Sequence, residues 1–206
     1  MKLAAINGSP RKEGNTWHAL NIACNELEKL GIETEIINIG HHEIRGCSAC
    51  GSCRSGDCVF DIQDWIKEAK EKIYSADAII IGTPVYYSGP AGTLKAFLDR
   101  LFYQSKGKLK HKPCAAIAAV RRTGGMPALE QIHNYFLISQ MIIVGSSYWN
   151  VIHGTAPRDI LKDTEGVGTI TMLARNIAWV MKLIENGKGS VETPEPLVKE
   201  FMNFIR

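Results

Sequence analysis

The stretch KLAAINGSPRKEGNT, residues 2–16, decides the fold of this 206-residue chain. Its apolar part, residues 3–6, predicts a short strand. The loop of glycines, hydroxyls and cations that follows leads directly into a helix predicted over residues 15–30. Cys24 lies on the apolar stripe of that helix and is expected in the core, and Gly31 is typical of a helix end. The stripe repeats at helical spacing: Leu20, Ala23, Leu27 and Leu30.

The loop between this strand and this helix has the residue types of a phosphate site. Its glycines let the backbone approach an anion closely, and the hydroxyls of Ser9 and Thr16 can join the amides of the helix N-terminus. The loop has no Gly-Lys-Ser/Thr triplet and lacks the three-glycine spacing of the dinucleotide fingerprint. Because caps and anion sites use the same residues, a plain turn capped by Asn15 or Thr16 remains an equal interpretation of this loop alone.

Strands and helices continue to alternate along the chain. A continuous apolar run at residues 78–82 predicts a strand buried on both faces, and residues 34–39, 114–120 and 141–144 predict three more. Apolar residues at helical spacing predict helices between them and a long last helix around residues 170–184. Five strands alternating with helices predict an α/β fold, a doubly wound parallel sheet with helices on both faces.

Two more loops follow predicted strands at the same edge of that sheet. TPVYYSG, residues 83–89, follows the third strand, and RRTGG, residues 121–125, follows the fourth. Ligands of doubly wound sheets bind at the switch point beyond the carboxyl ends of the strands. The loops can therefore enclose a flat ring with a phosphorylated tail, and residues 148–150 after the fifth strand could close such a site. Surface packing of the tyrosines and an ordinary glycine turn are the alternatives.

Four cysteines lie within twelve residues, with the spacing C-x2-C-x2-C-x4-C: Cys47, Cys50, Cys53 and Cys58. Compact runs of this kind hold iron–sulfur clusters, because two-residue gaps let successive thiolates turn toward one centre. Structural zinc sites more often use two separated pairs or include histidine, and reduced cysteines without a metal are the third interpretation. His41 and His42 are expected in a solvated turn before the run, and Cys114 in the core.

Composition and charge exclude several classes of protein. The chain is 45 % apolar and 22 % charged, as in an ordinary soluble protein. Its net charge is +3, and its basic residues are scattered along the sequence, which fits an anionic small ligand slightly better than a nucleic acid. No apolar run reaches the length of a membrane span, so no membrane association is expected. The N-terminus enters a predicted strand directly, so no targeting peptide is expected, and six cysteines without an expected export signal indicate a reducing cytoplasm.

We expect one domain over residues 1–190 and a separate amphipathic segment over residues 191–206. Pro194 and Pro196 break the chain at the start of this segment. Apolar residues then recur four apart: Leu197, Phe201 and Ile205, with Val198 and Met202 beside them. Such a segment must pack on its own domain or on a partner subunit.

Together these segments resemble the NADPH-dependent FMN reductase and iron–sulfur flavoprotein group of the flavodoxin superfamily. The resemblance covers about residues 1–185 and rests on GSPRKEGNT at 8–16, the four-cysteine run, TPVYY through GTLK at 83–95, and RRTGG at 121–125. It implies a flavodoxin-like sheet of five parallel strands in the order 2-1-3-4-5. The cysteine-rich loop, residues 40–60, would follow strand 2, and FMN would bind at the edge of the sheet.

The resemblance also implies roles for particular residues. The FMN phosphate would be bound by Ser9, Arg11, Asn15 and Thr16. The ribityl chain and ring would be lined by Pro84, Val85, Tyr86, Tyr87 and Gly89. The other side of the ring would be approached by Thr123, Gly124 and Gly125, with Arg121 or Arg122 nearby. The four cysteines match the run that holds a [4Fe–4S] cluster in iron–sulfur flavoproteins, and homodimers or homotetramers are implied, with the cluster near a neighbouring subunit's flavin.

The leading hypothesis is an FMN-dependent redox protein in which a [4Fe–4S] cluster passes electrons between FMN and an outside donor or acceptor, such as a ferredoxin. The alternative is an oxidoreductase without a cluster, in which NAD(P)H reduces FMN and the flavin reduces a quinone or free flavin. A zinc-stabilised binding module is the third hypothesis. Because FMN would carry the chemistry, no side-chain nucleophile or general acid is predicted.

Overall fold

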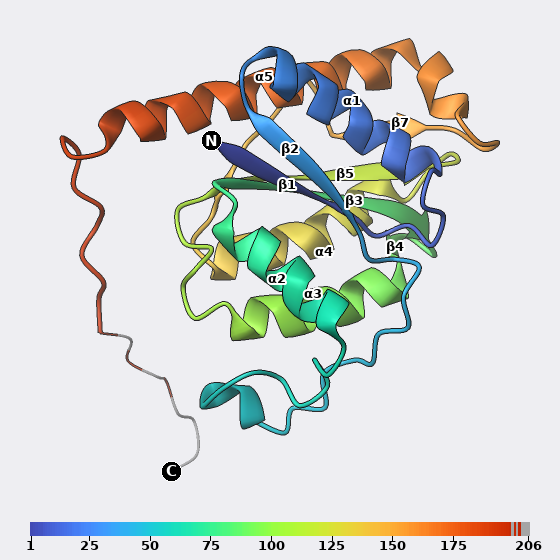
Figure 1. Ribbon diagram of the computed structural model, residues 1–206. Helices are drawn as coiled ribbons and strands as arrows, with labels where there is room; N and C mark the ends of the chain where they lie inside the picture. The colour runs from blue at the N-terminus through green and yellow to red at the C-terminus, as the bar shows by residue number, and fades with distance from the viewer. Residues whose placement is uncertain (199, 201, 203–206) are drawn as a thin grey trace.

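A central, mostly parallel β-sheet organises the chain (Figure 1). The structure, a computed structural model, describes residues 1–198, 200 and 202, with the backbone alone at residue 64. The main sheet has the order β2-β1-β3-β5-β6: β1 (Lys2–Asn7), β2 (Glu33–Asn38), β3 (Ala78–Tyr86), β5 (Pro113–Val120) and β6 (Ile142–Ile143). Two short strands lie off this path: β4 (Gly89–Pro90), antiparallel to β3, and β7 (Val151–His153), parallel to β5.

Helices cover both faces of the sheet, as the alternating pattern predicts (Figure 1). One face carries α1 (Asn15–Lys29) and α5 (Thr164–Gly187). The other face carries α2 (Asp64–Ser75), α3 (Gly92–Gln104) and α4 (Gly125–Ile138). Two short 3-10 turns, η1 (Ser52–Arg54) and η2 (Asp159–Lys162), lie in the cysteine loop and before α5. This α/β arrangement is flavodoxin-like.

The central strands are apolar throughout because both faces of the sheet are covered. In β3, Ile79 and Ile81 belong to the core beneath α2, α3 and α4, whereas Ile80 belongs to the core beneath α1 and α5. Cys24 and Cys114 are buried, as the sequence predicts. Burial raises the pKa of both thiols, that of Cys24 to about 11, so both are core residues.

The prediction of five strands is wrong, since the described residues form seven. The predicted fifth strand, residues 141–144, forms the two-residue β6, which pairs with the first residues of β5. The chain then leaves the sheet over residues 145–150, where Ser146 Oγ and Asn150 Oδ1 hydrogen-bond at 2.7 Å. It returns as β7 beside the last residues of β5. Two short strands therefore share the edge position expected for one.

The strand β4 arises from a tight turn that the sequence pattern did not reveal. Tyr86 pairs with Gly89, and the two residues between them, Tyr87 and Ser88, have positive φ angles of 50° and 60°. Two-residue turns with both central residues left-handed join hairpin strands well, because their twist matches that of the strands. Asparagine or glycine normally marks such a turn, and here tyrosine and serine take those positions.

The long helix α5 belongs to the core. Among the described residues it is the one helix long and apolar enough to cross a membrane, by length and composition alone, whereas no apolar run of that length was expected. Ile170, Leu173 and Ile177 are fully buried and pack in the same core as α1 and the sheet. Core helices of soluble proteins pass the same test, so α5 gives no more than weak evidence for a membrane.

The segment after α5 runs away from the sheet (Figure 1). Residues 191–198 form neither helix nor strand, and Leu197 and Val198 are each 93 % exposed. Phe201 and Ile205, on which the predicted amphipathic pattern depends, lie outside the described residues. The division into a domain over residues 1–190 and a separate tail therefore stays a prediction.

Candidate functional site

The loop between β1 and α1 is held in place by Asn7, the last residue of β1. Asn7 is fully buried, and its Oδ1 accepts a hydrogen bond from the Ser9 amide at 3.1 Å. Its Nδ2 donates to Asn38 Oδ1 at 2.8 Å and to the Lys12 carbonyl at 3.3 Å. One side chain thus connects the start of the loop, its middle and the end of β2. We call residues 7–16 the phosphate loop.

Close backbone contacts brace the phosphate loop from two more sides. The Gly8 amide donates to the Gly82 carbonyl at 2.9 Å, which ties the loop to β3. The chain leaving β2 passes directly over the loop at Gly40, where an added Cβ would lie 2.2 Å from the Gly8 carbonyl oxygen. Ser9 is buried, and its Oγ accepts from the Arg11 amide at 3.2 Å. The loop conformation is therefore fixed by the fold itself.

The N-terminus of α1 is open toward an anion. Gly14 precedes the helix without a side-chain cap, and no acidic residue lies in the first turn. Burial, together with the nearby charge of Arg158, lowers the pKa of His18. Asn15 Nδ2 donates to the Ala156 carbonyl at 3.0 Å, while its Oδ1 is buried without a partner among the described residues. A positive helix end suits an anion, and the unpaired oxygen suits a hydroxyl donor.

The turn between β3 and β4 meets the loop after β5. Gly124 has a φ of 89°, and an added Cβ would lie 2.8 Å from Ser88 Oγ, so the left-handed glycine allows the two loops to touch. The base of the hairpin is fixed by Thr83 Oγ1, which accepts from the Ala91 amide at 3.1 Å. Tyr87 projects fully into solvent from the turn. Two predicted parts of the ring site therefore adjoin one another.

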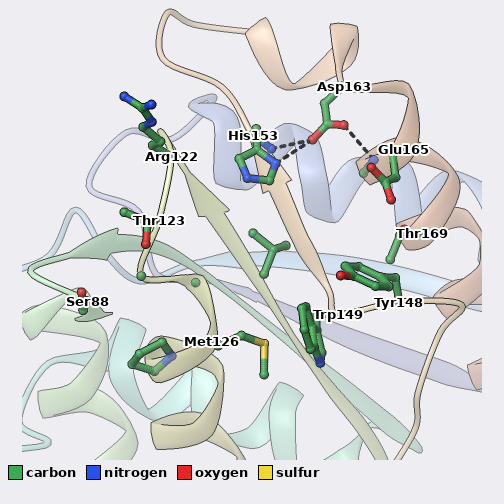
Figure 2. A pocket seen from close by; sticks show the side chains of 15 residues that line it. Ser88, Arg122, Thr123, Met126, Tyr148, Trp149, His153, Asp163, Glu165 and Thr169 are labelled. Carbon is green, nitrogen blue, oxygen red and sulfur yellow. Dashed lines mark hydrogen bonds and ion pairs between the residues drawn. The ribbon is translucent and has the colours of Figure 1, made fainter.

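A cavity of about 470 Å³ opens beside this contact (Figure 2). One wall is formed by Ser88 and residues 123–125. The opposite wall comes from β7, the loop before it and the start of α5: Tyr148, Trp149, His153, Asp163, Glu165 and Thr169. Tyr148 and Trp149 therefore face the same cavity as Thr123, Gly124 and Gly125, and their closing of a flavin site stays a prediction. Asn150 is buried and is not among the lining residues.

His153 and Asp163 form a connected pair in this cavity (Figure 2). The His153 amide donates to Asp163 Oδ2 at 2.8 Å, and His153 Nδ1 lies 3.2 Å from the same oxygen. The other carboxylate oxygen accepts from the Gly166 amide at 2.9 Å and caps α5. Burial alone would raise the pKa of Asp163, but the hydrogen bonds from Gly166 and His153 outweigh it and lower that pKa. Asp163 is therefore a carboxylate at neutral pH.

The predicted cofactor residues fall into two groups rather than one cavity. Thr123, Gly124 and Gly125 line the cavity of Figure 2. The remaining ones lie outside its lining: Ser9, Arg11, Asn15 and Thr16 at the phosphate loop, Pro84, Val85, Tyr86, Tyr87 and Gly89 at the hairpin, and Arg121 after β5. Ser9 and Thr16 are buried, whereas Arg11, Arg121 and the two tyrosines are exposed.

The four cysteines lie on the long connection between β2 and α2. Cys47 and Cys50 are exposed, and Cys53 and Cys58 are half-buried; all four thiols are free. In the part of the chain that the structure describes, no three histidine, cysteine or acidic side chains are grouped closely enough to hold a metal ion. The thiols therefore have the ligand chemistry of a soft metal site but are not gathered around a centre.

The aromatic residues at the start of this connection are arranged differently from the prediction. His41 is exposed, as expected, but His42 is half-buried and stacks on Trp65, with ring centroids 3.7 Å apart. Trp65 is half-buried and packs against the core beneath α2, α3 and α4. Burial lowers the pKa of both histidines, and the charge of Lys12 in the phosphate loop lowers both pKa values further.

Comparison with known proteins agrees with this geometry. Residues 1–156 match the family model of NADPH-dependent FMN reductases. The chain belongs to this family. An iron–sulfur flavoprotein from Methanocaldococcus jannaschii is 37 % identical, over 90 % of this chain and 100 % of the relative, and one from Methanosarcina thermophila is 34 % identical, over 91 % and 99 %. A flavodoxin, WrbA-like protein from Agrobacterium tumefaciens shares the fold, with a TM-score of 0.62 and 15 % identity over 88 % of this chain and 98 % of that one.

As a member of the FMN reductase family, the chain is a flavin-dependent oxidoreductase and an FMN-dependent redox protein that exchanges electrons with donor and acceptor partners. Its carboxyl edge fits the cofactor chemically. An uncapped helix N-terminus suits the phosphate, and the unpaired, buried Asn15 Oδ1 suits a hydroxyl group of the ribityl chain. The touching loops at Ser88 and Gly124 provide a surface of small residues for a flat ring.

The sequence did not predict the cavity residues that follow Trp149. His153, Asp163, Glu165 and Thr169 come from β7 and the start of α5, and β7 is too short to show a strand pattern. One signal was available, because Asp163 precedes a long apolar helical pattern and is a good N-cap residue. The pairing of that cap with His153 depends on the return of the chain beside β5, which no local pattern encodes.

Proposed function

We propose that this flavin-dependent oxidoreductase is an iron–sulfur flavoprotein, in which FMN and a [4Fe–4S] cluster on Cys47, Cys50, Cys53 and Cys58 exchange single electrons. The observation that carries the proposal is the four-thiol loop in a chain whose relatives along nearly the whole length bear that name. Soft thiolates suit iron, and the small spacers Ser48, Ala49, Gly51 and Ser52 leave amides free to hydrogen-bond sulfur.

The phosphate of FMN would bind at the phosphate loop. Ser9, Arg11, Asn15 and Thr16 would contact it, with the amides at the start of α1. The support is physical: the helix end is uncapped, its first turn has no acid, and Asn7 holds the loop rigidly. A site that is already ordered loses little conformational entropy when the ligand binds.

The ring of FMN would lie between the hairpin and the loop after β5. Pro84, Val85, Tyr86, Tyr87 and Gly89 would line one side, and Arg121, Thr123, Gly124 and Gly125 the other. FMN supplies electron and hydride chemistry when bound, so the side chains here bind and orient it. The cavity next to Gly124 would admit a second small molecule beside the ring, with His153 and Asp163 at its far wall.

The partners would be electron donors and acceptors: a ferredoxin, a quinone or NAD(P)H. We propose a cytoplasmic homodimer or homotetramer without nucleic-acid or membrane partners. Exposed apolar residues on α5, Trp179 at 64 % and Leu183 at 50 %, support burial against another subunit. A subunit contact there would bring a second copy to the helix that carries Asp163 at its start.

The proposed function is tested by anaerobic purification of the full chain, with an absorption spectrum and with iron, sulfide and FMN analysis. A brown chromophore over the yellow flavin, with iron and sulfide in equal amounts, is expected. Cys50→Ala should lose the brown absorption and keep the flavin. Zinc without flavin would select the binding-module hypothesis instead, and iron content unchanged in Cys50→Ala would exclude Cys50 as a ligand.

A second candidate function is an NAD(P)H-dependent FMN or quinone reductase without a cluster. It is favoured by the four thiols, which are not gathered around a centre, and by the family description. Steady-state oxidation of NADPH by flavin-loaded, iron-free protein, with turnover unchanged when all four cysteines are replaced by serine, would select it. Slow oxidation of NADPH with rapid reduction by a ferredoxin would select the cluster-containing carrier.

A further inference from the structure

Both ends of the four-cysteine loop are tied to one buried polar group of residues, the Asp61 cluster: Asp61, Lys70, Arg100 and Gln104. Each of the four is at most 7 % exposed. Arg100 Nη1 donates to the Arg45 carbonyl at 3.0 Å, two residues before Cys47. Gln104 Oε1 accepts from the Cys58 amide at 3.3 Å. Two residues of α3 thereby fix the points where the loop leaves and rejoins the domain.

The members of the Asp61 cluster are joined to one another by direct hydrogen bonds. The Asp61 carboxylate accepts from the Arg100 guanidinium and, at 2.8 Å, from Lys70 Nζ. Lys70 Nζ also donates to Gln104 Oε1 at 2.6 Å, the same oxygen that receives the Cys58 amide. Only one amide oxygen therefore separates a buried ammonium from the backbone of a predicted ligand.

The span between these anchors has local contacts instead. Among the described residues, the Ala49 amide lies 3.4 Å from Cys47 Sγ, and Cys50 Sγ lies 3.4 Å from Ser52 Oγ. The middle of the loop is exposed and so can close around a ligand, while its ends stay where the Asp61 cluster holds them. Fixed ends and a free middle are the properties needed by a loop that is completed by a metal.

The Asp61 cluster contains more positive than negative buried charge. Lys70 and Arg100 are both buried but share a single buried carboxylate. The next acid, Asp57, lies 3.7 Å from Lys70 Nζ, but its side chain is 75 % exposed, so water and salt screen it. Arg100 Nε is also buried without a partner among the described residues. A buried cation excess and an unpaired donor are unfavourable unless an anion comes close.

We propose that the Asp61 cluster positions the four-cysteine loop and supplies the positive charge that compensates an anionic iron–sulfur cluster bound there. This inference rests on the proposed function. A [4Fe–4S] cluster on four thiolates is anionic, and reduction adds one electron, and hence one negative charge, without a proton. Nearby positive charge stabilises the reduced form more than the oxidised form, so it raises the reduction potential. Lys70, Arg100 and Gln104 are positioning residues, because they act through Cys58, Arg45 and the local field.

The test compares Lys70→Met with Lys72→Met in the anaerobically reconstituted full chain. Lys72 lies on the same helix but pairs with Glu35 and Glu68, each at 2.7 Å, so the same substitution there removes equal charge from a site that does not contact the loop. The readouts are the midpoint potential of the iron–sulfur signal in an EPR-monitored redox titration, and the iron and FMN content per chain.

Lys70→Met is expected to lower the midpoint potential, so that the ratio of reduced to oxidised cluster at a fixed solution potential falls about tenfold, or 59 mV for one electron. Lys72→Met should leave it unchanged. Gln104→Glu keeps an acceptor for the Cys58 amide while adding negative charge, so it should shift the potential in the same direction and replaces Lys70→Met if that variant does not fold. Loss of iron from Lys70→Met with FMN retained would also support the positioning role.

Equal potentials and equal iron content in wild type, Lys70→Met and Gln104→Glu would overturn the inference. A wild-type chain that binds FMN but no iron would instead contradict the proposed function, and the inference would fail with it. The two failures are distinguishable because the first leaves the iron–sulfur signal of the wild-type chain intact.

Discussion

The phosphate loop and the four-cysteine loop both begin where a strand of the sheet ends, yet they are ordered in different ways. The phosphate loop is braced along its length by buried Asn7, by Gly82 and by the chain crossing at Gly40. The four-cysteine loop is held at its two ends, and its middle is exposed. The fold alone orders the first loop, whereas the second, under the proposed function, would be completed only by its iron–sulfur cluster.

The largest expected effect comes from filling the gap where the chain crosses the phosphate loop. In Gly40→Ala, the new Cβ would lie 2.2 Å from the Gly8 oxygen and 2.5 Å from the Ser9 carbonyl carbon, both backbone atoms that cannot rotate away. We expect FMN affinity to fall about 100-fold, equivalent to about 2.7 kcal/mol, when measured by quenching of flavin fluorescence. Gly56→Ala, with no atom within 4 Å of its Cβ, is the matched control in the other loop. FMN binding as tight as wild type in Gly40→Ala would show that the phosphate loop can move.

Removal of the Asn7 side chain should have the next largest effect. Asn7→Ala leaves the buried Ser9 amide and Asn38 without their partner, which costs about 1–3 kcal/mol of stability and weakens FMN binding about tenfold. Urea unfolding and FMN titration measure the two effects. Ser48→Ala, in the exposed part of the cysteine loop, should change neither quantity. Similar losses of stability and FMN affinity in both variants would contradict the conclusion that the phosphate loop is held more firmly than the four-cysteine loop.

Removal of iron should affect the two loops differently, without any mutation. Chelation of iron from the reconstituted protein should leave FMN affinity within about twofold of its starting value, because none of the hydrogen bonds described for the phosphate loop involves the four cysteines. Cleavage by a protease within residues 46–56 should become several-fold faster, since the exposed loop would lose its ligand. Loss of FMN together with the iron would mean that the two sites are not independent.

A smaller, pH-dependent effect is expected at the cavity wall. The pKa of Asp163 lies below its ordinary value of 3.8 because hydrogen bonds from Gly166 and His153 outweigh burial. A lowered folded-state pKa contributes stability above the unfolded pKa, and that contribution is lost as the pH falls through the folded value. Asp163→Asn should therefore cost about 0.5–1 kcal/mol at neutral pH, and the difference from wild type should shrink as the pH falls below 3.8 and through the lowered folded-state pKa. A difference that stays constant throughout this acid range would rule out the carboxylate as its source.

The sequence predicts those parts whose pattern is local. Residues 2–29 form the expected strand, loop and helix, and the continuous apolar runs of β3 and β5 mark buried strands. The strands β4 and β7 escape prediction because they are two and three residues long, and because the turn before β4 uses Tyr87 and Ser88 instead of glycine or asparagine.

The candidate site likewise has parts that the local sequence predicts and parts that depend on the fold. The sequence identifies the phosphate loop and the cysteines from their residue types and spacing, but not which of them the fold holds in place. The contacts of Gly40 with Gly8 and of Cys58 with Gln104 join residues far apart in the chain, and the contact of His153 with Asp163 joins residues on either side of a loop and a 3-10 turn. Such pairs follow from how the strands and helices pack, so they become visible once the fold is known.

The most direct test of this account is the FMN, iron and sulfide content of two proteins reconstituted without oxygen: the wild-type chain, and the variant with serine in place of Cys47, Cys50, Cys53 and Cys58. The account predicts that wild type binds FMN together with iron and sulfide in equal amounts, and that the variant loses iron and sulfide but binds FMN with unchanged affinity. A wild-type chain without iron, or a variant that loses FMN as well, would contradict it.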